Sequence, residues 1–132
     1  MTLDQDPIWS GALIEESLEN EDLLEMVDVI DTRTGTLESE AEAGDLTFDS
    51  VEVFDNEIEQ VVACAMKTLK PSWYFHLVNE AGDTMIVMFK GKKFMIKKGD
   101  EKGLEEVKAY GISQGIHEDQ LELGMLFEDP FA

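Results

Sequence analysis

The segment from Met85 to Phe89 consists of five consecutive apolar residues between two short glycine-containing links. A short apolar run bounded by turn residues is typical of a strand that is buried on both faces. Strand-like runs also lie at residues 73–79 and 92–97, and links of this length join antiparallel neighbours. Residues 73–97 therefore predict a three-stranded antiparallel meander in which the 84–89 strand is central.

Two helical patterns flank the meander. Residues 57–69 repeat apolar positions at the spacing of one helical face, Pro71 ends the pattern, and Asn56 with Glu59 has the spelling of a capping box. Residues 101–110 form the second pattern, with Asp100 as its cap and Gly111 at its exit. The sequence thus predicts two main helices, and a short third helix is expected at residues 118–123.

The N-terminal half contains further strand-like segments. Residues 26–34 and 46–54 alternate apolar and polar positions, but the apolar parity of the second changes, so we expect a bulge at Asp49–Ser50. Residues 8–14 fit a strand or the start of a helix through Leu24, and we favour the strand. The order becomes β, short α, β, β, α, β, β, β, α.

This order predicts one α+β domain with a mostly antiparallel sheet and both main helices (57–69 and 101–110) packed on one face of it. No internal repeat or Pro- or Ser-rich linker divides the chain. Residues 38–45 are acidic and lack a periodic apolar position, so we expect a mobile loop there and loosely held ends.

The cysteine content and the N-terminus indicate a compartment. Cys64 is the single cysteine, which excludes an intramolecular disulfide and zinc sites that need paired cysteines. The first residues lack the basic and apolar parts of a signal peptide, and no apolar run approaches the roughly 20 residues of a membrane helix. We expect a cytoplasmic protein that does not bind membranes.

The formal net charge of −20 is unevenly divided along the chain. Residues 1–66 hold 19 acids and one base, residues 67–108 hold nine bases and six acids, and residues 109–132 hold five acids and no base. Such a field attracts basic proteins and repels polyanions. We therefore expect a basic protein as partner, with the acidic half as the docking surface.

A lysine cluster stands against this trend, and it is interleaved with aromatic residues as in single-strand nucleic-acid platforms. Lysines on an outer strand more often prevent edge-to-edge aggregation, so we do not expect nucleic acid to bind. The cluster consists of Lys90, Lys92, Lys93, Lys97 and Lys98, beside Phe89 and Phe94.

One motif has the spelling of a nucleophile elbow. Residues 111–115 read G-x-S-x-G, but the elbow needs a strand before its serine, whereas the segment before Ser113 is helical in pattern. We interpret the motif as a helix terminus and predict that Ser113 is not a nucleophile.

Other chemical patterns are weaker still. Cys64 could pair with His76 or His117, although no local signature supports such a pair. Residues 31–35 superficially suggest a calcium loop, but Arg33 stands where an oxygen ligand belongs. The sequence predicts no catalytic residue, no metal site and no cofactor.

The functional hypothesis is a small, acidic, non-catalytic domain that acts through protein–protein contacts. The alternative is a ligand-binding domain or enzyme with a pocket near Trp73, Tyr74 and His76, where two aromatic rings and an imidazole are close in sequence. A convergent pocket with shifted titrating groups would favour the alternative.

Overall fold

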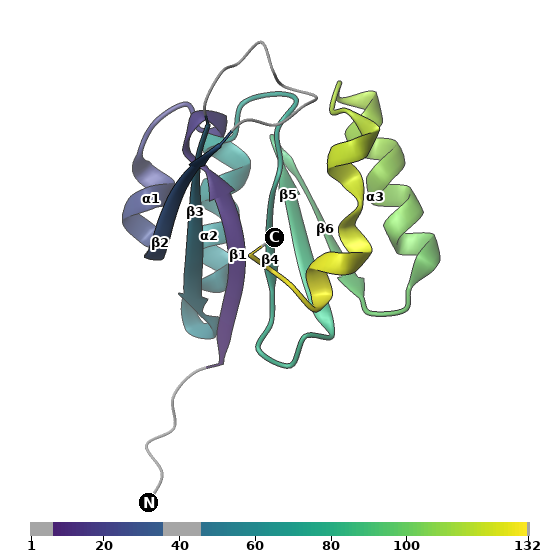
Figure 1. The fold of residues 1–132 in the computed structure, drawn as a ribbon, viewed down its shortest axis with the longest axis horizontal. Coiled ribbons are helices and arrows are strands. Elements are labelled where there is room, and N and C mark those ends of the chain that lie inside the picture. The colour runs from purple at the N-terminus through teal and green to yellow at the C-terminus, as the bar shows by residue number, and fades with distance from the viewer. Residues whose placement is uncertain (1–6, 36–45, 132) are drawn as a thin grey trace, which may run out of the picture.

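The computed structural model describes residues 7–35 and 46–131. They form a single α+β domain around a six-stranded antiparallel sheet in the order β2-β3-β1-β4-β5-β6 (Figure 1). The strands are β1 (Ile8–Ile14), β2 (Asp28–Gly35), β3 (Leu46–Phe54), β4 (Phe75–Val78), β5 (Thr84–Phe89) and β6 (Lys92–Lys97). The helices are α1 (Asp22–Met26), α2 (Ile58–Thr68) and α3 (Glu101–Ser113), with 3-10 turns η1 (Glu15–Ser17), η3 (Asp55–Glu57), η4 (Glu118–Leu121) and η5 (Leu123–Phe127).

The predicted meander is confirmed, and β5 and β6 have the predicted bounds. Every residue of β5 is buried. Its alternate side chains enter two separate cores, with Ile86 and Met88 in one and Met85, Val87 and Phe89 in the other. Because successive side chains of a strand point to opposite faces, both faces of β5 are covered.

The two main helices lie on opposite faces of the sheet, so the expectation that both pack on one face is wrong. Val61, Val62 and Ala65 of α2 join the core that contains Ile86 and Met88. Val107 of α3 joins the other core, together with buried residues of η4 and η5. A central strand that is apolar on both faces needs a cover on each side.

The strand assignment at residues 8–14 is confirmed, and β1 lies between β3 and β4. The pairing of β1 with β3 is regular from Ile8↔Phe54 to Ile14↔Phe48, so the expected bulge at Asp49–Ser50 is wrong. The irregularity lies instead in β2, between Val29 and Asp31. The parity changes because a carboxylate, Asp49, takes a core-facing position opposite Leu13.

The helix ends depart from the sequence patterns in two places. The N-cap of α2 makes no side-chain hydrogen bond, so the Asn56–Glu59 capping box is wrong, and a 3-10 turn begins the helix instead. The Asp100 cap is confirmed, because its Oδ1 accepts a hydrogen bond from the Gly103 N–H at 2.9 Å. The helix α3 continues through Gly111 to Ser113, and the left-handed position falls at Gly115 (φ +88°).

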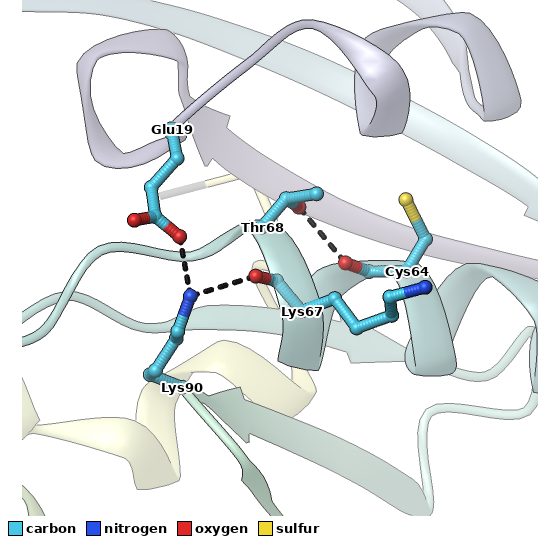
Figure 2. A network of polar contacts seen from close by, with 5 residues as sticks. All are labelled: Glu19, Cys64, Lys67, Thr68 and Lys90. Carbon is cyan, nitrogen blue, oxygen red and sulfur yellow. Dashed lines mark hydrogen bonds and ion pairs between the residues drawn. The ribbon is translucent and has the colours of Figure 1, made fainter.

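The C-terminus of α2 is held by the turn between β5 and β6 (Figure 2). The Lys90 Nζ donates to the carbonyl oxygen of Lys67 at 2.8 Å and also pairs with the Glu19 carboxylate. The Gly91 N–H donates to the Met66 carbonyl at 2.9 Å. The last carbonyls of a helix need such donors, and a cation there also interacts favourably with the helix dipole.

The expected mobile loop at residues 38–45 and the outermost residues of both ends lie outside the described residues. Across residues 7–35 and 46–131, no helix has the length and apolar character that would let it cross a membrane.

We expect Val62→Asp to abolish cooperative folding, because Val62 is buried in the core beneath α2 and an unpaired charge there has no compensating partner. Ala63→Asp is the matched control, because Ala63 is the neighbour of Val62 on α2 and is exposed. This change should lower the free energy of unfolding by less than about 1 kcal/mol. Urea unfolding followed by circular dichroism measures both. Equal stabilities of the two variants would show that this face of α2 is not part of the core.

Candidate functional site

The three residues of the expected pocket are divided between the two faces of the sheet. Trp73 packs against the core beneath α2, whereas Tyr74 packs against the core beneath α3. His76 pairs with Val87 of β5 and shares that second face. His76 is buried, because only 4% of the residue is exposed.

The polar atoms of Tyr74 and His76 are engaged by the C-terminal part of the chain. The Tyr74 hydroxyl donates to the carbonyl of Gln120, and burial raises the pKa of Tyr74 to about 12. The Nε2 atom of His76 lies 2.7 Å from the carbonyl oxygen of Pro130. Burial lowers the pKa of His76 to about 4, although the Pro130 carbonyl opposes this shift. A neutral imidazole that donates from Nε2 satisfies both conditions.

The structure does not bring Cys64 and the histidines together as a catalytic pair. Cys64 is half-buried on α2, on one side of the sheet, and His76 faces the other side. His117 is exposed in the connection between α3 and η4, which pack on the same side as His76. The sheet therefore separates the thiol from both imidazoles.

The remaining chemical motifs have ordinary structural settings. Ser113 is the last residue of α3, and its Oγ donates to the Tyr110 carbonyl at 2.5 Å, which confirms the helical interpretation of the G-x-S-x-G motif. Residues 31–35 lie within strand β2 and not in a metal-binding loop. In the part of the chain that the structure describes, no group of three or more His, Cys, Asp or Glu residues is placed to hold a metal ion.

The segment that ends at Phe131 crosses the sheet face that α2 leaves uncovered, and Figure 1 shows this yellow segment running toward β4. Besides His76, Arg33 of β2 holds this segment, because its Nη2 donates to the Phe131 carbonyl at 3.2 Å. The Arg33 guanidinium lies over the Phe48 ring, 5.4 Å from the ring centroid. This cation–π contact directs Arg33 across β3 toward the chain end.

A groove of about 290 Å³ lies beside the C-terminal segment. It combines apolar walls with three carboxylates, and the carboxylates of Glu52 and Glu80 make no ion pair with any other residue of 7–35 and 46–131. The third, Glu128, pairs with Lys98 at 3.1 Å. The lining residues are Ile8, Ser10, Glu52, Val78, Asn79, Glu80, Gly82, Phe127, Glu128 and Pro130.

This groove could not be predicted from the sequence, because its walls come from separate parts of the chain: β1, β3, the end of β4 with the β4–β5 connection, and the C-terminal segment. No periodicity or motif links these parts. The only signal in the sequence was general, namely that β1 and β3 belong to the acidic half. Trp73, Tyr74 and His76 are not among the lining residues.

The chain matches no protein-family profile, and comparisons with curated proteins and with solved structures give no match. The proposed function therefore depends on the geometry and charge of this chain alone.

We expect His76→Gln to reduce the acid sensitivity of the protein. The pKa of His76 is lower in the folded state (about 4) than its ordinary value of 6.5. The folded state therefore binds fewer protons between these pH values, and this histidine lowers the free energy of unfolding as pH falls from 6.5 toward 4. Melting temperatures across this range, taken relative to wild type, measure the effect.

The exposed His117, changed to Gln, is the matched control for this measurement. Relative to wild type, His76→Gln should gain stability as the pH falls, and it should gain more than His117→Gln does. Identical profiles for the two variants would contradict the buried, neutral state of His76.

Proposed function

We propose that this chain is a non-catalytic protein-binding domain whose groove docks an extended basic segment of a partner protein. The single observation that carries the proposal is the groove that joins apolar walls to the carboxylates of Glu52 and Glu80. Lysine and arginine side chains combine an apolar stem with a cationic head, so they fit a site of this composition. The partner segment therefore alternates basic and apolar residues.

The charge of the surrounding surface favours the same partner. The groove is walled by β1 and β3, which belong to the half of the chain that holds 19 acids and one base. A surface of one sign steers an oppositely charged partner toward it and raises the association rate, and salt screens this effect. Binding should therefore weaken strongly as ionic strength rises.

Other acids of this half are less suited to docking because they support the fold. The Glu16 carboxylate accepts hydrogen bonds from the Thr47 N–H at 2.7 Å and from the Thr47 hydroxyl at 2.9 Å. Glu19 is paired with Lys90. Neutralising these residues would perturb β3 and α2, which makes Glu52 of this half and Glu80 of the β4–β5 connection the sharper test positions.

The lysine cluster is a weaker candidate surface, because several of its members already make contacts within the chain. Lys90 holds α2, Lys97 donates to the Thr84 hydroxyl at 3.0 Å, and Lys98 pairs with Glu128. The Lys92 ammonium lies 5.3 Å from the centroid of the Phe94 ring. We therefore do not propose nucleic acid as a partner.

The free thiol of Cys64 supports a reducing, cytoplasmic setting.

The alternative of a ligand pocket near Trp73, Tyr74 and His76 receives less support. Trp73 is on the opposite face from the other two, whose polar atoms bind carbonyls of the C-terminal part of the chain. A ligand that used these atoms would have to displace that part of the chain. The groove needs no such rearrangement.

The test is titration calorimetry with an acetylated, extended peptide of alternating arginine and valine, at about 50 and about 300 mM NaCl. We expect the double variant Glu52→Gln, Glu80→Gln to weaken binding at the lower salt by at least about tenfold, because both unpaired carboxylates are removed. The wild-type affinity should also fall at the higher salt.

The matched control is the double variant Lys92→Gln, Lys93→Gln. It removes two charges from the edge strand β6, which does not line the groove. It should bind the peptide as tightly as wild type or more tightly. Equal losses in the two double variants, or no binding of the peptide by wild type at about 50 mM salt, would refute the proposed docking site.

A further inference from the structure

Asp49 of β3 is a buried carboxylate with half of its hydrogen-bonding capacity unused. Only 1% of the residue is exposed, and its Oδ1 accepts a hydrogen bond from the Thr32 hydroxyl at 2.7 Å. Its Oδ2 is buried and has no hydrogen-bond donor among the described residues. A buried oxygen without a donor is costly, and a proton on a neighbouring group would satisfy it.

Leu13 of β1 lies opposite Asp49, and Glu15 follows Leu13 by two residues, which brings the Glu15 carboxyl next to that of Asp49. Glu15 begins η1, directly after β1, and the two hydrogen bonds that Glu16 accepts from Thr47 fix this turn against the start of β3. Two ionised carboxylates cannot hydrogen-bond to each other, because neither carries a donor. A bond between Glu15 and Asp49 therefore requires a proton on one of them.

We propose that Glu15 and Asp49 hold one proton between them, with Glu15 as the acid that donates to Oδ2 of Asp49. This proton completes the hydrogen bonding of the buried carboxylate. It also supports the junction of three strands, since Asp49 on β3 accepts from Thr32 on β2 and lies opposite Leu13 on β1.

The charged groups around the pair favour the protonated form. The hydrogen bond with Asp49, followed by burial and by the negative charges of Asp49, Glu16 and Glu21, raises the pKa of Glu15 to about 7. The group that faces the pair from β2 is the neutral hydroxyl of Thr32. Within residues 7–35 and 46–131 no cation is among these influences, so the two carboxylates repel each other once the proton leaves.

The neighbouring Glu16 behaves in the opposite way, which separates the roles of the two residues. Burial opposes ionisation of Glu16, but the hydrogen bonds from Thr47 and the charge of Lys70 lower its pKa. Adjacent carboxyl groups whose pKa values move apart take different protonation states at the same pH. As the pH falls below about 7, Glu15 takes up the proton while Glu16 remains the anion that anchors η1.

The stability of the domain should therefore fall as pH rises toward and past neutrality. The pKa of Glu15 is about 7 in the folded state and 4.5 ordinarily, so the folded state binds more protons between these values. The contribution of the pair is complete below pH 4.5 and is lost as pH rises through 7. Other acidic groups of the chain also make stability depend on pH. The wild type is therefore compared with a variant in which only Glu15 is changed.

Glu15→Gln tests the proposal, because its amide can donate to Asp49 at every pH. We expect this variant to melt at a higher temperature than wild type at about pH 8 and to lose the decline between about pH 5 and pH 8. Glu25→Gln is the matched control, because Glu25 is an exposed acid on α1 that is not among the groups acting on Glu15, and it should keep the wild-type decline. Carbon-13 NMR of the Glu15 carboxyl in the wild type should give a midpoint near 7.

Two results would overturn the proposal. One is a Glu15 carboxyl that titrates at its ordinary value, together with equal declines in wild type and Glu15→Gln. The other is stabilisation of wild type by Mg²⁺ or Ca²⁺, relative to a chelator, that disappears in Glu15→Gln. That outcome would assign a cation, and not a proton, to the space between the two carboxyl groups.

Discussion

The architecture depends on a strand that is apolar on both faces and therefore needs a cover on each side. In β5 the alternate side chains enter two separate cores, one beneath α2 and one beneath α3 with the C-terminal turns. Hydrophobic burial of this kind is non-directional, so the cover can be a helix or a set of short turns. On one face the cover of β5 is the helix α2. On the other face it is α3 with the turns η4 and η5, and this cover leaves β1 and β3 partly open.

The sequence predicted the elements well because their signals are local. The alternation of β6, the apolar run of β5 and the helical spacing of α2 each lie within a dozen residues, and the structure confirms them. The sides on which the helices pack were predicted wrongly, although the run at residues 84–89 already implied a cover on both faces. A pattern of one strand states that both faces are buried, but it does not state which segment covers each.

The candidate sites could not be predicted because they depend on strand register. The groove joins residues as far apart as Ile8 and Pro130, and the carboxyl pair joins the end of β1 to the middle of β3. The change of apolar parity at Asp49 was visible in the sequence and was interpreted as a bulge. An acid in a core-facing position produces the same irregularity, and only the pairing of Asp49 with Leu13 distinguishes the two causes.

The strand order gives the sheet two edges of opposite charge, since Asp28 and Asp31 lie on β2 and three lysines lie on β6. Copies of such a sheet would attract one another head to tail, and a contact of that kind does not close on itself but continues into a fibre. The irregular pairing of β2 with β3 between Val29 and Asp31 distorts the acidic edge. A distorted edge offers no continuous ladder to an incoming strand, so the irregularity in β2 disfavours the addition of a further strand at this edge.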